Sequence, residues 1–557
     1  MGTAPLAVVL AVVAGVGVAP ATGPTPSPEP PPSAPPNVIE TPRDLDATPA
    51  PRDQLTASAA TCAGLPAVPV RDGKPVIVQL KPAQAFDVAK LNATSWSRPP
   101  VSDPTWQLMY YSLRWMGPLV RSAVEKKQPA TLNMLITQAA RFYALNPDRG
   151  LSRLGWDEGS SLRRLEALNC LYRMTKDKRL IPGMTTEVNL QFGPRYYGPP
   201  KYMAHNHGLM ANERIVVAGQ LLGKPAWIAK ASARMRTESA MAFTPTGTSY
   251  EQSAMYHDVV LQMWSAAAAT LAGINPKDPA VPRIRTVLRR ATNVSQWLTE
   301  PDGRFVQYGD TSLVQGRPAP TRAGAGVLRD DRAGIVVGRW SWKDPKTTYY
   351  SVRYGPARVA HGHHDKSAIT WTTAGSRVLV GSGYFGSDGG SPYVAYHRRA
   401  GAANVAVPVG ATARATPAKL TRAIVRGTRH RWSVADTVFG RNHGRAIDVD
   451  HPSRTLTVSD AFAGRVTADQ FWHLDPSWTL ISARPTARSR TQVMRFRNTV
   501  TGRTLTVRTT GVVVSALRGS NRPVAGWNFP HTYQKVANWE LRVRWTGGTV
   551  RTTFRVT

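Results

Sequence analysis

The spacing of apolar residues changes once along the chain, and the change predicts two structurally different halves. From about residue 76 to residue 324, apolar residues recur three and four positions apart, a period that indicates amphipathic helices. Short breaks rich in Gly, Pro and Asn separate the helical segments, as is typical of antiparallel helix pairs. The segments that carry the period are residues 104–124, 131–145, 159–174, 209–223 and 258–274.

From about residue 325 the period shortens to two. Val, Thr, Trp and Tyr are frequent there, between turn residues, which predicts strands. These strand segments are residues 333–342, 347–355, 367–383, 454–462, 501–514 and 539–557. We therefore expect an α+β chain of more than one domain: a helical domain in residues 63–324, followed by an antiparallel β-sandwich in residues 325–557.

The first 62 residues fit neither domain. The apolar run from Leu6 to Val18 is too short to span a bilayer but has the length of a secretory h-region, so residues 1–22 read as a signal-like segment, although no basic residue precedes the run. Residues 23–62 are rich in proline and predict an extended linker. We expect a chain that is secreted or attached to the cell envelope, and no apolar run predicts a membrane span.

Composition adds a strong charge. Among 557 residues, 70 Lys and Arg outweigh 35 Asp and Glu, a net charge of +35. Such a surplus indicates a polyanionic partner, or else a general basic bias of the source proteome. The two cysteines, Cys62 and Cys170, allow one disulfide or none, and their number excludes a cysteine-based metal site.

Three polar clusters interrupt the apolar pattern, and the first is "HNHG". His205, Asn206 and His207 stand directly before the helical segment that begins near residue 209. The first N–H groups of a helix have no internal partner and favour anions, so an Asn amide and a His imidazole there are suited to hold a carboxylate. The alternative is that Asn206 only caps the helix.

The second cluster is "GTSYEQSAMYH", residues 247–257. Gln252 and Tyr256 are four positions apart and share one face of the helix that begins there. A tyrosine at this place serves either as a catalytic acid or as a packing residue, and the segment alone leaves both readings open.

The third cluster is "HGHHDKS", residues 361–367. His361 and His363 alternate along an extended segment and point to the same side. The H-x-H-x-D-H pattern of binuclear metallo-hydrolases would need a histidine where this chain has Lys366, so that reading is weak.

Taken in order, these clusters and the "YGDT" of residues 308–311 resemble the heparinase II/III superfamily of polysaccharide lyases, which includes alginate lyase-like relatives. "SWSRPPVSDPTWQLMYYSLRWM" and "GWDEGSSLRRLEAL" are also similar to that family's helical domain. The resemblance covers about residues 80–410. It implies an N-terminal (α/α) toroid joined to a β-sandwich, with the active site between them.

The resemblance also implies a reaction, β-elimination in a uronic-acid polysaccharide. It assigns Asn206 and His207 to neutralising the substrate carboxylate, Tyr256 to proton donation, and His361 to a second acid/base role. The residues expected to contact substrate are Arg164, Gln252 and one of the tyrosines Tyr393 and Tyr396.

The family carries a zinc ion on its sandwich, and this chain departs from the ligand pattern. His363 matches one ligand, but Gly381 and Ala403 stand where an aspartate and a histidine are expected. One histidine cannot hold a structural zinc, so we expect no cofactor, with His363 as a hydrogen-bonded residue and Asp365 as a partner of basic groups. His364 should point away from His363. The alternative is a displaced ligand set that recruits His397 or Asp388.

Two other functions stay open. A glycoside hydrolase on the same scaffold would need two facing carboxylates, for which Glu213, Glu251, Asp258 and Asp310 are available. A non-catalytic binder of acidic glycan or wall polymer would show salt-sensitive binding without turnover. A nucleic-acid partner is not expected, because no recognisable basic motif is present.

Overall fold

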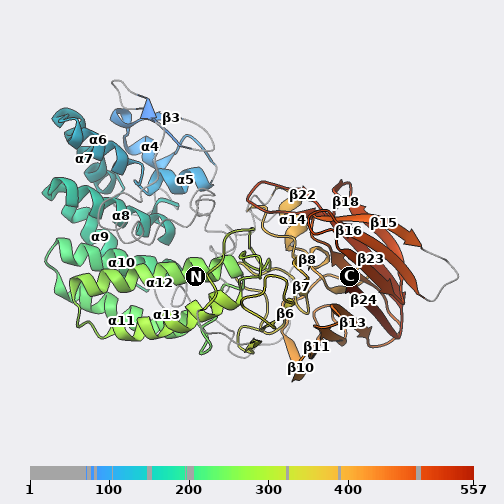
Figure 1. Cartoon of the computed structure of the whole chain (residues 1–557). Coiled ribbons are helices and arrows are strands. Elements are labelled where there is room, and N and C mark those ends of the chain that lie inside the picture. Colours follow the sequence, from blue (N-terminus) through green and yellow to red (C-terminus); the bar gives the residue numbers. More distant parts are fainter. Residues whose placement is uncertain are drawn as a thin grey trace.

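The computed structural model places a helical half beside a half built from β-sheets (Figure 1). The signal-like segment, the proline-rich linker and Cys62 lie outside the described part of the chain. The described residues are 70–71, 77–80, 85–102, 104–146, 154–194, 196, 206–320, 325–386, 390–484 and 491–557.

The helices form two layers. Helices α6, α8, α10 and α12 pack in succession against one another, and each contacts the helix that follows it in the sequence. This arrangement of helix pairs is the predicted one. The helices are α4 (Ala93–Ser97), α5 (Pro104–Tyr111), α6 (Met116–Glu125), α7 (Pro129–Leu145), α8 (Glu158–Thr175), α9 (Ile181–Phe192), α10 (Asn206–Leu221), α11 (Pro225–Ala242), α12 (Ala254–Ile274) and α13 (Ala280–Trp297).

One predicted helix is divided. Residues 104–124 carry a continuous helical period, yet α5 ends at Tyr111 and α6 begins at Met116. Between them Leu113 has a φ of +55°, and the Ser112 hydroxyl accepts a hydrogen bond from the backbone N–H of Arg114 at 3.2 Å. The Ser112 side chain thus takes the place of a helical backbone acceptor, and such local hydrogen bonds compete with continuation of a helix.

The second half consists of antiparallel sheets. An eight-stranded sheet has the order β10-β11-β12-β13-β24-β17-β16-β15, and its inner face packs against a five-stranded sheet, β4 to β8, and a four-stranded sheet, β18-β23-β14-β9. The predicted fold class, a helical region followed by antiparallel sheets, is confirmed. The strands are β4 (Gly326–Asp330), β5 (Ile335–Arg339), β6 (Tyr349–Arg353), β7 (Ile369–Thr373), β8 (Ser376–Leu379), β9 (Ala406–Pro408), β10 (Ala418–Arg426), β11 (Arg429–Asp436), β12 (His443–Asp450), β13 (Thr455–Phe462), β14 (Thr467–His473), β15 (Trp478–Arg484), β16 (Gln492–Asn498), β17 (Thr504–Thr509), β18 (Val512–Arg518), β23 (Trp539–Thr546) and β24 (Thr549–Val556).

Shorter elements complete the chain. Helix α14 (Pro392–Arg398) follows β8 and precedes β9 in the sequence. A small sheet precedes the helices, and two hairpins follow β18. They are formed by β1 (Val70–Arg71), β2 (Ile77–Gln79), β3 (Ala85–Asp87), β19 (Ser520–Asn521), β20 (Val524–Ala525), β21 (Trp527–Asn528) and β22 (Val536–Ala537).

The five-stranded sheet is buried on both faces, and this joins the two halves. Every residue of β5, β6 and β7 is buried. One face belongs to the sandwich core, through Val336 and Trp371 for example. The other face, with Ile335 and Val337, packs on residues of the helical half such as Val294. Burial of apolar area on both faces makes this sheet the main contact between the halves.

Among the described helices, none is both long enough and apolar enough to cross a bilayer. Cys170 is buried in α8 and is disulfide-bonded.

Candidate active site between the two halves

The turn of residues 308–311 lies between the halves and caps helix α12. The hydroxyl of Thr311 accepts a hydrogen bond from the backbone N–H of Ala254 at 3.1 Å. Ser253 is the N-cap, accepts from the N–H of Tyr256 at 3.2 Å and donates to a backbone carbonyl of the turn at 2.6 Å. The N–H groups of the first turn of α12, which have no partner within the helix, thereby gain acceptors. The same bonds hold residues 308–311 at the end of the helix that carries Tyr256.

Gly309 brings this turn against the histidine loop, residues 361–367. Its φ is +55°, and a Cβ placed on it would lie 2.2 Å from the backbone oxygen of Gln252 and 2.6 Å from that of His361. Only glycine tolerates both the conformation and the approach. The backbone N–H of Asp310 donates to the same His361 oxygen at 2.8 Å. The turn and the loop are therefore in direct backbone contact.

Tyr256 and His361, predicted to act together, are stacked across the boundary between the halves. Their ring centroids lie 3.3 Å apart with an interplanar angle of 7°. Tyr256 stands in the first turn of α12, whereas His361 stands in the loop before β7. Tyr256 is 4% exposed, and the His361 side chain keeps 22% of its surface. One catalytic candidate from each half thus lies in one place.

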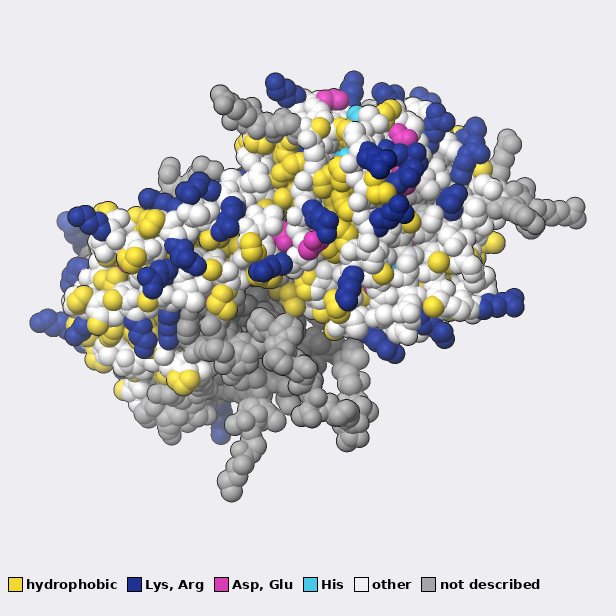
Figure 2. Space-filling model, turned by 90° about the horizontal axis from the view of Figure 1, so that it is seen from below, with side chains coloured by type: hydrophobic (Ala, Val, Ile, Leu, Met, Phe, Trp, Pro, Cys, Tyr) yellow, Lys and Arg dark blue, Asp and Glu magenta, His cyan; other side chains and the backbone are white. Residues whose placement is uncertain are grey.

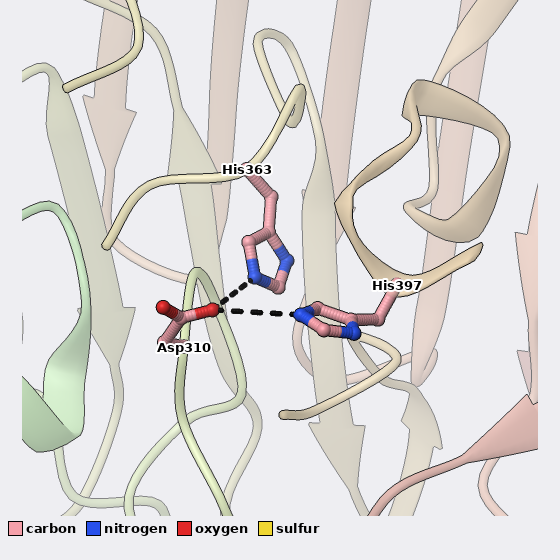
Figure 3. A group of neighbouring side chains, drawn as sticks. All are labelled: Asp310, His363 and His397. Atoms are coloured by element: carbon pink, nitrogen blue, oxygen red, sulfur yellow. Dashed lines mark hydrogen bonds and ion pairs between the residues drawn. The ribbon is translucent and has the colours of Figure 1, made fainter. Parts of the chain in front are cut away.

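A buried carboxylate, Asp310, has three histidines around it. Its Oδ2 accepts from Nδ1 of His361 at 3.0 Å and its Oδ1 from Nε2 of His363 at 2.8 Å. Nε2 of His397 lies 3.6 Å from the same Oδ1 (Figure 3). Burial by itself would raise the pKa of Asp310, but the hydrogen bonds from His361 and His363 hold it well below its usual value. The ionised carboxylate fixes the proton of His361 on Nδ1 and sets the orientation of its ring.

A second carboxylate faces the other nitrogen of His361. Oε2 of Glu251 lies 3.4 Å from its Nε2, so the imidazole stands between Glu251 and Asp310. A glycosidase needs open space for a sugar between its two carboxyl groups. Here an imidazole fills that space.

The other carboxylates available to a hydrolase are held in ion pairs. Asp258 lies 2.6 Å from the guanidinium of Arg317, and Glu213 lies 3.0 Å from that of Arg214. The arrangement therefore does not favour the hydrolase alternative.

Asn206 and His207 begin helix α10, which packs against α12. Asn206 is the first helical residue rather than a cap preceding the helix. Within the described residues, no hydrogen bond reaches its buried Oδ1. His207 is 2% exposed. His205 lies outside the described residues.

Gln252, a predicted substrate contact, is used inside the protein. Its Nε2 donates to the carbonyl of Ala357 at 2.8 Å, and its Oε1 accepts from the N–H of Val359 at 3.1 Å. The amide therefore holds the chain that leads into His361. In this structure it positions the histidine loop.

Arg164 is likewise placed differently from the prediction. It has no exposed surface, and its Nε lies 2.6 Å from Oε1 of Glu187. The guanidinium also donates to the carbonyls of Tyr111 and Gly155 at 2.9 and 2.8 Å. A buried charge requires such partners. The enclosed side chain offers nothing to a polysaccharide, so the prediction of a substrate contact is corrected.

The tyrosine beside Tyr256 and His361 is a third one, not either of the two named from the sequence. Tyr396 is buried and donates to Glu540 at 2.9 Å, and Tyr393 donates to Asn521 at 2.8 Å. Tyr384 instead packs with Tyr256 in one buried cluster, and its ring centroid lies 5.7 Å from that of His397. The "GSGYF" that contains Tyr384 is visible in the sequence, but its fold-mediated neighbours are not.

The zinc ligands implied by the family resemblance do not fit here. A Cβ on Gly381 would lie 2.1 Å from the carbonyl oxygen of Gln307, so the chain itself occupies the place where an aspartate side chain would begin. Gly381, Ala403 and His363 line one small cavity. Asp365 has the guanidinium of Arg353 at 3.6 Å, so its predicted pairing with a basic group is confirmed.

A different set of donors is nevertheless present. Asp310, His363 and His397 each offer one ligand atom, and these atoms all lie within 4.8 Å of one another. His397 was an alternative ligand named from the sequence, and the other, Asp388, lies outside the described residues. From the sequence, Asp310 is expected only as a carboxylate available to a hydrolase. The "YGDT" motif marks its position, but the histidines that surround it are brought there by the fold.

Comparison with known proteins shows which family and which solved structures the chain resembles. Residues 82–319 match the family described as heparinase II/III N-terminus. No curated protein matches the chain. A crystal structure of heparinase III aligns with a TM-score of 0.66 at 14% identity, covering 83% of this chain and 78% of that chain. The heparan sulfate lyase HepC from Pedobacter heparinus aligns with a TM-score of 0.61 at 14% identity, covering 93% and 84%.

At these identities the structural likeness establishes the fold, which the solved heparinases share with the present chain over both halves. The resemblance predicted from the motifs is thereby confirmed: residues 82–319 match the heparinase II/III N-terminal domain, and the chain has the fold of heparinase III over both halves.

Proposed function

We propose that this chain is a polysaccharide lyase that cleaves a uronic-acid-containing polyanion by β-elimination. The observation that carries the proposal is the stack of Tyr256 on His361, because it unites an acid from the helical half with an acid/base group from the sandwich. The shared fold of heparinases supports it. The signal-like segment adds the proposal that the protein acts outside the cell or at its envelope.

The reaction assigns a task to each residue. Neutralising the substrate carboxylate makes the neighbouring C5 proton acidic enough to remove, and we assign this to Asn206 and His207. A base then takes the C5 proton, a C4–C5 double bond forms, and the C4–O bond breaks. Tyr256 donates a proton to the departing glycosidic oxygen, with His361 as the second acid/base. Asp310 orients His361.

The surface charge supports a polyanionic substrate. Lys and Arg side chains cover far more of the face shown in Figure 2 than Asp and Glu do, in line with the net charge of +35. A positive field raises the rate of encounter with an anionic polymer and does so most at low salt.

The test is a panel of uronic-acid polymers, read by near-ultraviolet absorbance of the unsaturated product. We expect absorbance with at least one polymer. Tyr256→Phe should lower the rate by about 100- to 10,000-fold, the usual contribution of a general acid, with little change in unfolding. Tyr354→Phe is the matched control, since this buried tyrosine bonds Asp331 away from the site at 2.6 Å.

Each other outcome has a meaning. New reducing ends without ultraviolet absorbance would identify a hydrolase. Salt-sensitive binding without any product would identify a glycan-binding protein. Near-normal turnover by Tyr256→Phe would make Tyr256 a packing residue.

A further inference from the structure

Three side chains from separate segments of the chain converge on one place (Figure 3). Asp310 comes from the turn after the helices, His363 from the histidine loop and His397 from α14. Two imidazole nitrogens approach one oxygen, Oδ1 of Asp310, at 2.8 and 3.6 Å. Ligand atoms around a tetrahedral zinc, each about 2.0–2.2 Å from the ion, lie about 3.3 Å apart. The observed spacings bracket this distance.

The tautomer of His397 is fixed by its surroundings. Its Nδ1 lies 3.1 Å from the carbonyl oxygen of Tyr393, which can only accept, so Nδ1 carries the proton. In the neutral ring, Nε2 then presents a lone pair toward the carboxylate of Asp310. A hydrogen bond from Nδ1 to a backbone carbonyl is also the usual support of a metal-binding histidine.

A lone pair that faces a carboxylate is unfavourable unless a cation lies between them. His397 is 1% exposed, and within the described residues no hydrogen bond reaches its Nε2. The 3.6 Å separation from Asp310 is too long for such a bond. Nor does any described Lys or Arg side chain come within ion-pair distance of Asp310. The cluster therefore combines a buried anion with an unused nitrogen donor.

We propose that Asp310, His363 and His397 bind one divalent transition-metal ion, for which Zn²⁺ fits the two-nitrogen, one-oxygen donor set best. Binding displaces the proton that His363 shares with Asp310, and this proton leaves to solvent. The ligand set differs from the one implied by the family at two of its three positions. It also connects the metal to the proposed active site, because the second oxygen of Asp310 holds Nδ1 of His361.

The experiment measures metal binding without any substrate, so its result is independent of the proposed lyase activity. Protein purified without chelators is analysed for metal, stripped, and titrated with Zn²⁺ against a chromophoric chelator. Co²⁺ then reports the coordination by its visible absorption. We expect one equivalent of Zn²⁺, about one proton released per ion, and a Tm that falls on stripping.

Variants assign the ligands. His397→Ala and Asp310→Asn should weaken Zn²⁺ binding by more than about 100-fold, since a lost ligand costs more than a lost supporting hydrogen bond. His364→Ala is the matched control, because it removes a neighbouring histidine outside the donor set. If His397→Ala does not fold, judged by circular dichroism, His397→Gln takes its place. Failure of the wild type to bind one equivalent, or equal binding by His397 variants and wild type, would overturn the proposal.

Discussion

Two buried aspartates organise this molecule, and their partners differ. Asp460, in β13, receives two bonds from Arg445 at 2.7 and 2.9 Å, one from Gln470 at 2.7 Å and one from His443 at 2.9 Å. His443 uses its other nitrogen on Asp436 at 2.8 Å. All the strong donors and acceptors are satisfied within the sandwich.

Among the described residues, the carboxylate of Asp310 has only histidines as side-chain partners. Of these, His361 is partly exposed and His397 has a nitrogen without a hydrogen bond within the described residues. An arginine cannot give up its proton, whereas an imidazole can lose, gain or share one with a ligand. The comparison teaches that a buried carboxylate saturated by arginine serves stability, while one surrounded by histidines remains available for chemistry.

The largest effect should come from breaking the cluster around Asp460, called here the saturated cluster because its carboxylate is fully hydrogen-bonded. Arg445→Met leaves the carboxylate of Asp460 buried without its main counter-charge, and removing one partner of such a pair costs about 3–5 kcal/mol of unfolding free energy. Arg445 also holds the carbonyls of Ser367 and Asn404 at 2.9 and 2.6 Å. Denaturant unfolding measures the loss. A change below about 1 kcal/mol, the scale of an exposed pair, would contradict the comparison.

Substitutions in the histidine cluster, the histidines around Asp310, should lower activity more than stability. His361→Gln is expected to lower turnover by about 100- to 10,000-fold, as for a lost acid/base group, with less loss of stability than Arg445→Met. His443→Gln is the matched control in the other cluster and should show the reverse order. Product absorbance and denaturant unfolding measure the two properties. If both histidine variants lose stability and activity alike, the distinction between the clusters is wrong.

The saturated cluster should make the free energy of unfolding depend on pH, through His443. Burial by itself would lower the pKa of His443, but hydrogen bonds to Asp436 and Asp460 outweigh it and raise this pKa from 6.5 to about 8. The stabilisation is complete below pH 6.5 and is lost as pH rises through about 8. It amounts to about 2 kcal/mol. Unfolding curves across this range measure it, and a slope that persists in His443→Gln would assign it to other groups.

The smallest effect concerns the tyrosines near the histidine cluster. Tyr384→Phe should lower turnover about tenfold, the effect of one lost hydrogen bond of about 1.4 kcal/mol in a transition state. Tyr393→Phe, whose hydroxyl bonds Asn521 and Lys535 instead, should stay within about twofold. Steady-state kinetics compare the two variants. The reverse ranking would restore Tyr393 as the second tyrosine.

Much of the fold was predictable because its patterns are local. The shift of period from three and four to two separates the helical half from the half built of sheets. The division of the helix at residues 112–115 was not predictable, because it depends on one side chain bonding to its own backbone.

The site was predictable only in part. Tyr256 and His361 followed from the order of the motifs, and the structure places them in contact. Asp310 and Tyr384 were not assigned there, because their neighbours come from segments far away in the sequence. Arg164 illustrates the opposite error: the sequence shows a basic residue in a helix but not that Glu187 lies beside it.

The position of β24 has a consequence for the order of events during synthesis. This strand lies between β13 and β17 in the middle of the eight-stranded sheet, and Phe554 belongs to the core that supports β6 and β7. A ribosome produces α12 and its tyrosine nearly 300 residues before that strand. The histidine loop gains its finished platform only after residues 549–556 have been added. The stack of Tyr256 on His361 is therefore completed late, when almost all of the described chain has already been made.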